Sequence, residues 1–229
     1  MNDFDILSDG LALLCGSDSQ VEAVIAPRRE EIFSLLAKYI VEIERHNPAL
    51  GIVGTNDRRE LVVRHILDSL APLGIISRFL ANDIRAQIAD VGSGAGLPGI
   101  PLAIALPQAE FTLIERSGRR ANFLRNTIAA LGIGNAAVEE GEMEKAKPGR
   151  FRMVTFRAFR PLEPKILKKL HRLCAKDGVL AAYKGRPEKI KAEMAALEAA
   201  MPNVSLNWEL QPCPVPLLDE QRHLVVIYK

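Results

Sequence analysis

Cysteine is scarce in this chain, and the few cysteines are scattered. Cys15, Cys174 and Cys213 are the only three among 229 residues, and no two of them form a C-x-x-C pair. An odd number of isolated cysteines predicts neither a disulfide framework nor a zinc site, and it suits a reducing compartment. We therefore expect no disulfide and no bound metal.

Long hydrophobic runs are also missing. No apolar stretch approaches the length of about 18 residues that spans a bilayer. The first residues, Met1–Asp5, carry acids where a signal peptide would carry bases. These features argue against membrane insertion and secretion, and we expect a cytoplasmic protein.

Aromatic residues make up only 5% of the chain, and the formal net charge is only +2. Positive charge is nevertheless concentrated between Lys145 and Lys191, where fifteen lysines and arginines stand against three acids. Two interpretations remain open for this stretch, a solvated helical surface or a basic face that contacts nucleic-acid phosphates. With so few rings for stacking, a nucleic-acid partner would be recognised mainly through shape and phosphates.

The length fits one α/β domain with a modest extension. Apolar residues recur at helical spacing over about 27–46 and 57–71, and glycine, proline and asparagine mark a loop between these helices. Residues 1–26 show no firm period, so we expect a loosely held lead-in there. We divide the chain into a helical extension, 1–80, and a compact core, 81–229.

Strands and helices alternate through the core. The expected strands cover 87–91, 111–115, 135–140, 152–157 and 178–184, and the helices between them begin near Pro98, Ser117, Pro161 and Pro187. Such alternation predicts a parallel sheet covered on both faces. Two strands then follow in succession, 204–210 and 223–228, and successive strands usually pair antiparallel. We expect a mostly parallel seven-stranded sheet with an antiparallel C-terminal strand.

A glycine-rich turn follows the first strand, in the segment Asp90-Val-Gly-Ser-Gly-Ala-Gly-Leu-Pro-Gly99. The early glycines of this turn let a ligand approach the backbone closely and permit positive φ angles. Twenty-five residues after Asp90, the second strand ends in Glu115, whose carboxylate can accept hydrogen bonds from both hydroxyls of a ribose. The sequence therefore predicts a site for a nucleotide-like cofactor.

Two cofactors are compatible with this turn. Gly94–Gly99 satisfies the G-x-G-x-x-G pattern of dinucleotide-binding dehydrogenases. The strand, however, ends at Gly92, outside that pattern, and the Asp90 carboxylate would repel a pyrophosphate. S-adenosylmethionine (SAM) carries a sulfonium and an ammonium instead, so it tolerates a neighbouring acid. We favour SAM, with an NAD-dependent oxidoreductase as an alternative, and the antiparallel end resembles the Rossmann-like class I SAM-dependent methyltransferases.

Five segments of the chain, taken together, resemble one bacterial family. They are Arg64–Ser69, Asp90–Pro101, Arg157–Phe159, Lys184–Gly185 and Arg222–Ile227. On these segments the chain, from about residue 30 to its end, is similar to the glucose-inhibited division protein B family, whose members methylate N7 of a guanosine in 16S ribosomal RNA. The resemblance implies SAM as methyl donor and 16S ribosomal RNA, or the small ribosomal subunit, as partner; we expect a monomer.

The resemblance also implies roles for individual residues. The cofactor-binding set comprises Asp90, Gly92, Gly94, Gly96, Leu97, Glu115 for the ribose, Met143 and Glu144 for the adenine, and Arg157. Arg157 is also the candidate catalytic residue, with a positioning role, because guanine N7 has a lone pair and no proton for a general base to remove. The set assigned to RNA comprises Arg64, His65, Arg160 and Lys184.

Simpler interpretations of two of these positions remain open. An arginine at a strand end such as Arg157 is often a surface ion pair, and Arg64 and Asp68 are spaced for a solvent-facing helical ion pair.

Three positions depart from the family pattern. Gly51–Val53 stands where the family has Asn-Leu-Thr, Glu142 replaces an arginine, and Arg152 replaces an acid. We expect Arg152 to add positive charge near the cleft. Two alternatives therefore stay open beside an RNA methyltransferase: a SAM-dependent methyltransferase of a small molecule or protein, and a SAM-binding module without activity.

Overall fold

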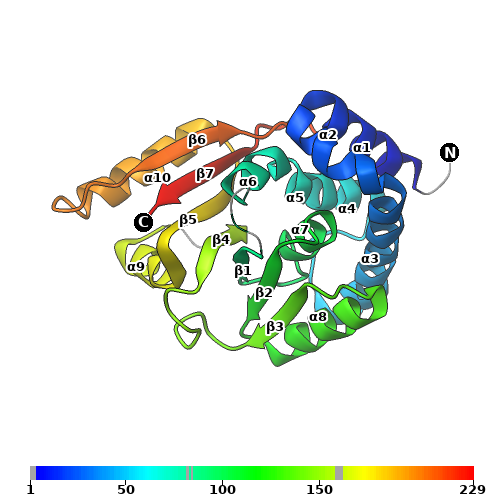
Figure 1. Cartoon of the computed structure of the whole chain (residues 1–229), viewed down its shortest axis with the longest axis horizontal. Coiled ribbons are helices and arrows are strands. Elements are labelled where there is room, and N and C mark those ends of the chain that lie inside the picture. Colours follow the sequence, from blue (N-terminus) through cyan, green and yellow to red (C-terminus); the bar gives the residue numbers. More distant parts are fainter. Residues whose placement is uncertain (1–3, 81–82, 84, 158–161) are drawn as a thin grey trace.

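A seven-stranded sheet with helices on both faces forms the protein (Figure 1). The computed structural model describes residues 4–80, 83, 85–157 and 162–229. The strands are β1 (Gln87–Val91), β2 (Glu110–Glu115), β3 (Ala136–Glu140), β4 (Phe151–Arg157), β5 (Cys174–Lys184), β6 (Trp208–Pro212) and β7 (His223–Tyr228). Their order is β3-β2-β1-β4-β5-β7-β6, with β7 antiparallel to both of its neighbours. The expected sheet is confirmed.

Alternate residues of the central strands enter two separate hydrophobic cores. Ile88 of β1 faces the core that includes the N-terminal helices, whereas its neighbour Ala89 faces the core that includes α9 (Pro164–Leu173) and α10 (Pro187–Ala199). Because a parallel sheet buries both of its faces, its strands are almost continuously apolar. The carboxyl ends of β1, β2 and β4 consequently meet at one buried edge, where ligands bind in open α/β sheets.

The helices divide between the two faces of the sheet (Figure 1). One face carries α7 (Gly99–Ala105), α8 (Gly118–Leu131) and a layer of N-terminal helices. This layer consists of α1 (Asp5–Ser17), α2 (Ser19–Ile25), η1 (Ala26–Arg28), α3 (Arg29–Leu50), α4 (Arg58–Leu61), η2 (Val62–Leu67), α5 (Asp68–Leu70) and α6 (Leu73–Leu80). It shares one buried core with the sheet. The division of the chain at residue 80 stays a prediction.

The expectation of a loosely held lead-in was wrong. Residues 5–25 form α1 and α2, and Leu7, Leu11 and Leu14 are buried on one side of α1. In the sequence, the polar residues and Gly10 that lie among these leucines make their helical spacing hard to recognise. Gly10 is small for a packing reason, because a Cβ there would lie 2.9 Å from Cδ2 of Leu67. The segment is therefore a fixed part of the helical layer.

Several element boundaries also differ from the expectation. Helix α3 continues through Pro48 to Leu50 and ends at Gly51, which takes a left-handed conformation with φ 54°. The second helix includes a π-helical segment, η2, that periodicity did not indicate. Helix α9 begins at Pro164; Pro161, its expected start, lies outside the described residues.

The C-terminal strands differ in length from the expectation. Strand β5 begins four residues before the expected Gly178, and β6 begins at Trp208, after the predicted start at Val204.

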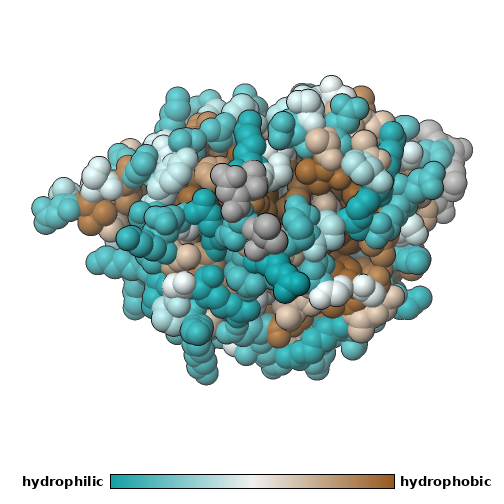
Figure 2. Space-filling model, in the orientation of Figure 1, coloured by the Kyte–Doolittle hydropathy of each residue, from teal (hydrophilic) through white to brown (hydrophobic). Residues whose placement is uncertain are grey.

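Hydrophilic residues cover most of the face shown in Figure 2. Within the described residues, no helix has both the length and the apolar composition to cross a bilayer. The same part of the chain has no group of three or more His, Cys, Asp or Glu side chains arranged to hold a metal ion.

Candidate cofactor and substrate site

The loop between β1 and α7 has a conformation that needs glycine. Gly92, Gly94 and Gly96 have φ angles of 72°, 59° and 93°, in the region that L side chains rarely adopt. A Cβ at Gly96 would also lie 2.5 Å from Cδ1 of Ile100 in the following helix. At Gly94, by contrast, the nearest heavy atom to a Cβ would be the Gly92 carbonyl oxygen at 3.8 Å. The middle of the loop thus leaves room for a ligand.

The Asp90 carboxylate holds this loop in place through hydrogen bonds. Its Oδ2 accepts hydrogen bonds from the Gly99 amide at 3.1 Å and from the Ser93 hydroxyl. Its Oδ1 is buried and has no hydrogen-bond partner. Burial raises the pKa of this carboxyl to about 6, against the opposing hydrogen bonds of Ser93 and Gly99. A buried carboxylate of this kind is poorly compatible with a pyrophosphate and compatible with a cationic ligand.

Glu115 connects the loop to the end of β2. Its Oε2 accepts the Gly94 amide at 2.9 Å, and its Oε1 accepts the Ser117 amide at 2.8 Å. A carboxylate has about four lone-pair sites, so both oxygens can accept one further hydrogen bond. The side chain is buried and lines a cavity of about 460 Å³. This placement fits the predicted ribose contact.

The same cavity contains the two residues predicted to lie beside an adenine. Met143 is buried in its wall, whereas the exposed Glu144 forms an ion pair with Lys169 of α9. Arg172, which the sequence did not point to, holds this segment from α9. Its Nη2 donates to the carbonyl oxygens of Met143 at 3.3 Å, Glu144 at 2.6 Å and Ala146 at 2.7 Å.

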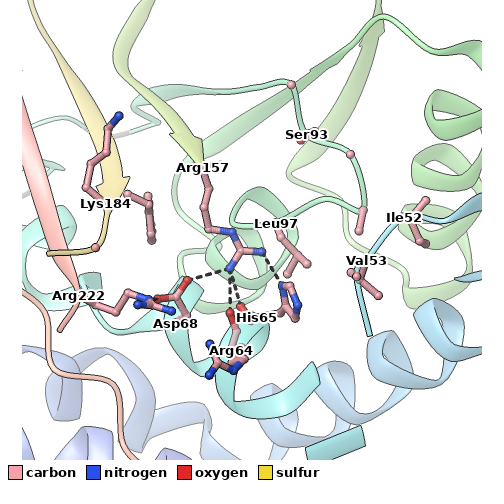
Figure 3. Close-up of a pocket in the computed structure, with 16 residues that line it drawn as sticks. Ile52, Val53, Arg64, His65, Asp68, Ser93, Leu97, Arg157, Lys184 and Arg222 are labelled. Carbon is pink, nitrogen blue, oxygen red and sulfur yellow. Dashed lines mark hydrogen bonds and ion pairs between the residues drawn. The ribbon is translucent and has the colours of Figure 1, made fainter. Parts of the chain in front are cut away.

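A second cavity, of about 450 Å³, lies between the glycine loop and the N-terminal helices. Arg157, the last residue of β4, extends into it (Figure 3). Its Nη1 lies 2.9 Å from Oδ2 of Asp68, and its Nη2 lies 3.2 Å from Nδ1 of His65. Nη1 also donates to the His65 carbonyl oxygen at 3.3 Å. Asp68, with its side chain 8% exposed, accepts from Nε of Arg222 at 3.2 Å as well.

His65 is a neutral hydrogen-bond partner of Arg157. Burial, followed by the charge of Arg157, lowers the pKa of His65 to about 4. Because an arginine N–H can only donate, Nδ1 of His65 accepts and the ring proton lies on Nε2. The interpretation of Arg157 as a surface ion pair is therefore wrong, since its partners Asp68 and His65 lie inside the cavity.

The helical ion pair between Arg64 and Asp68 is not formed. Arg64 pairs with Glu60 and Glu220, whereas Asp68 pairs with Arg157 and Arg222. The π-helical segment η2 lies at this point and changes the angular relation of residues four apart. Arg64 thus stays at the rim while Asp68 points inward.

The other expected substrate residues lie in different settings. Lys184 lines the second cavity, but its Nζ is held at 2.9 and 3.0 Å by Glu193, which does not line that cavity. Arg160 lies outside the described residues. The expectation for Arg152 was wrong: it lines neither cavity and donates to the Asp177 carbonyl oxygen. Arg152 stands near the start of β4, whereas the site forms where the strand ends.

Gly92 lines both cavities, which therefore adjoin at the glycine loop, and we call the two together the cleft. One side of the cleft carries Glu115 and Met143, and the other carries Arg157 and His65. Of the remaining predicted residues, Gly94, Leu97 and Arg64 line the second cavity, whereas Asp90 and Gly96 support the loop from behind. Tyr183 and Arg222 also line the second cavity, and no sequence pattern assigned them a role. Arg222 does fall within a segment that carries the family resemblance.

This chain is similar in sequence to two bacterial proteins that share one name. A protein from Treponema denticola named ribosomal RNA small subunit methyltransferase G is 32% identical over 98% of this chain and 96% of its own length. A protein of the same name from Xanthomonas campestris is 39% identical over 85% of each chain.

Solved structures support the class I SAM-dependent methyltransferase fold. A SAM-dependent methyltransferase from Aquifex aeolicus superposes with a TM-score of 0.51 at 18% identity, over 69% of this chain and 88% of that one. A predicted O-methyltransferase from Agrobacterium tumefaciens superposes with a TM-score of 0.52 at 26% identity, over 72% of this chain and 79% of that one. The family model described as rRNA small subunit methyltransferase G, or GidB, matches residues 32–224. This chain therefore belongs to the GidB family, as its motifs led us to expect.

Proposed function

We propose that this protein transfers a methyl group from SAM to N7 of a guanosine in the 16S RNA of the small ribosomal subunit. Membership of the family makes the chain a SAM-dependent methyltransferase and favours small-subunit ribosomal RNA over small molecules, proteins and the NAD alternative. The N7 atom and the residue roles are part of the proposal. The observation that carries it is a cleft with the buried Glu115 carboxylate at one end and the Arg157 guanidinium, held by Asp68, at the other.

The cofactor side of the cleft fits SAM. Glu115 would bind the ribose hydroxyls, and Met143 with the adjoining backbone would contact the adenine. The unpartnered Oδ1 of Asp90 lies behind a loop whose middle glycine is open. When bound, SAM supplies an electrophilic methyl group on its sulfonium. The chain's own task is to hold donor and acceptor in line and to exclude water.

The substrate side of the cleft is built for orientation. Guanine N7 attacks with an in-plane lone pair, so no residue has to remove a proton. His65 is kept neutral by burial and by Arg157, its Nδ1 is occupied by Arg157, and Arg157 itself is held by Asp68 and by backbone carbonyl groups. Arginine N–H groups match guanine O6 or a phosphate. We assign Arg157 and His65 the positioning of the guanine, with Arg64, Arg160 and Lys184 assigned to the RNA around it.

The remaining parts of the proposal concern the setting of the reaction. We propose that the protein works in the cytoplasm, as a monomer and without a metal ion. The helical layer before residue 80 forms one wall of the substrate cavity, through His65 and Asp68.

Methyl transfer from radiolabelled SAM tests the proposal. Separated small ribosomal subunits, free 16S RNA and bulk protein would each be offered as substrate. Arg157→Ala is the test variant, and Arg152→Ala is its matched control because Arg152 lies on the same strand and lines neither cavity. We expect label on guanine N7 with the wild type and the control, and loss of label with Arg157→Ala. Label confined to protein, or no labelled RNA, would overturn the function.

A further inference from the structure

Glu220 bridges two arginines at the rim of the substrate cavity. Its Oε1 lies 2.5 Å from Nη2 of Arg64, and its Oε2 lies 2.9 Å from Nη1 of Arg222. Glu220 belongs to the segment between β6 and β7, whereas Arg64 belongs to η2, 156 residues earlier. Both arginines line the cavity, and Glu220 does not. One carboxylate thus spans two cations beside the place where the guanine is proposed to bind.

Each arginine also has a partner other than Glu220. Nε of Arg222 keeps the buried Asp68 as a partner at 3.2 Å, and Nε of Arg64 keeps Glu60 at 3.4 Å. The side chains of Glu220 and Arg64 are 41% and 39% exposed. Exposed ion pairs of this kind contribute little to stability and exchange readily with other partners. Glu220 can therefore leave while Arg222 keeps its buried partner Asp68 and Arg64 keeps its contact with Glu60.

The chemistry of the bridge is that of a phosphate contact. A phosphodiester, like a carboxylate, offers two oxygens to planar N–H donors, and arginine is well suited to such bidentate recognition. Hydrogen bonds from Arg64 and Arg222 lower the pKa of Glu220, so the bridging group is an anion. The position held by Glu220 is therefore one that an RNA phosphate could take.

We propose that Arg64 and Arg222 bind one backbone phosphate of the substrate RNA, and that the Glu220 carboxylate occupies this phosphate position until RNA displaces it. The inference rests on the proposed function and adds a defined contact to it. Glu220 then acts as a competitor of the RNA phosphate and lowers the affinity of the protein for its RNA.

Glu220→Gln tests the inference because it removes the charge and keeps the shape. Glu31→Gln is the matched control: Glu31 accepts two hydrogen bonds from Arg28, is exposed, and lines neither cavity. Affinity for free 16S RNA would be measured by filter binding at fixed salt. We expect Glu220→Gln to bind about two- to tenfold more tightly than Glu31→Gln, the range that corresponds to one or two exposed ion pairs. Replacing both Arg64 and Arg222 with alanine should abolish this gain.

Binding of S-adenosylhomocysteine separates a competitor from a structural brace. Unchanged affinity of Glu220→Gln for this molecule, together with tighter RNA binding, supports the inference. RNA binding no tighter than that of Glu31→Gln, or weaker binding of both ligands, would overturn it. If the wild type methylates 16S RNA while Glu220→Gln binds no more tightly, only the phosphate site fails. A wild type that neither binds nor methylates 16S RNA would overturn the proposed function as well.

Discussion

The hydroxyl group of Tyr39 donates a 2.7 Å hydrogen bond to the carbonyl oxygen of Ala95. Tyr39 is fully buried in α3, and Ala95 lies between Gly94 and Gly96 in the cofactor loop. Burial raises the pKa of Tyr39 well above its ordinary value, so the hydroxyl keeps its proton and donates. The N-terminal helical layer thereby fixes the backbone that is proposed to hold SAM.

Tyr39→Phe should weaken cofactor binding. The substitution removes one oxygen and leaves the buried Ala95 carbonyl without its donor, at a cost of about 1–3 kcal/mol. We expect the affinity for S-adenosylhomocysteine, measured by calorimetry, to fall about tenfold. Tyr228→Phe is the control, since its hydroxyl donates to Oε1 of Glu209 at 2.9 Å and Tyr228 lines neither cavity. Equal losses in both variants would show a general packing effect.

Asp68→Asn should impair both stability and methyl transfer. Asp68 is the shared carboxylate of Arg157 and Arg222, and removing its charge leaves two largely buried cations underpaired. Loss of one partner of a buried pair costs about 3 kcal/mol. Urea unfolding should show a loss of this order, whereas Glu140→Gln, in the exposed pair with Arg125, should cost less than about 1 kcal/mol. A stability loss at Asp68 no larger than that at Glu140 would contradict a buried network.

Arg172→Ala should weaken cofactor binding without changing RNA affinity. Arg172 holds the backbone of residues 143–146 through three carbonyl groups, so its loss loosens the wall beside the proposed adenine. Lys169→Ala provides the comparison, because Lys169 lines the cavity beside the proposed adenine but pairs with the exposed side chain of Glu144 and not with the backbone carbonyl groups. S-adenosylhomocysteine affinity should fall several-fold for Arg172→Ala and little for Lys169→Ala. A larger loss of affinity in Lys169→Ala than in Arg172→Ala would show that the Glu144 side chain, and not the backbone, contacts the adenine.

His65 should make the protein less stable as the pH falls from about 6.5 to 4. Its pKa is lowered to about 4 in the folded state, so over this range the unfolded chain binds a proton that the folded chain does not. Unfolding then becomes easier, by about 1–3 kcal/mol from this group. The fall should be smaller in His65→Gln when urea unfolding is measured at pH 7 and pH 4.5. Identical pH profiles of the two proteins would contradict a buried neutral imidazole.

RNA binding should depend strongly on salt. Many cations between Lys145 and Lys191 have internal partners, among them Arg152, Lys169, Arg172 and Lys184, so only part of this stretch is available to phosphates. About five phosphate contacts would give a log–log slope of affinity against salt of roughly −3.5 to −4.5. Filter binding from low to high salt measures the slope directly. A flat response would remove RNA as the partner.

Much of the sheet could be predicted from the sequence because its signals are local. The segment around Asp90 predicts a strand, a glycine turn and a helix within about a dozen residues, and the structure contains all three. Gly132 ends α8 with a left-handed φ of 67°, as its position after an apolar period indicates. Such features depend on neighbouring residues alone, so a single sequence reveals them.

The substrate side was harder to predict because its contacts join distant segments. Arg157 forms an ion pair with Asp68, which lies 89 residues away in the sequence, and Arg222 pairs with the same carboxylate at a separation of 154 residues. No rule of sequence spacing pairs residues so far apart. The rule that pairs helical residues four apart predicts an Arg64–Asp68 ion pair, whereas Asp68 pairs with Arg157 and Arg222. Helix α1 was missed for a different reason, since Gly10 weakens the helical signal at the point where α1 packs against Leu67.

The π-helical segment η2 determines how Arg157 can be studied by mutation. Arg157 reaches the carbonyl oxygens of Arg64 and His65 as well as side chains, so part of its support is main chain. Substitutions at these two positions delete side chains and leave the carbonyl groups in place. An alanine scan would therefore underestimate what this turn of helix does for the site. A single-residue insertion or deletion in the turn, which would displace those carbonyl groups, would reveal it.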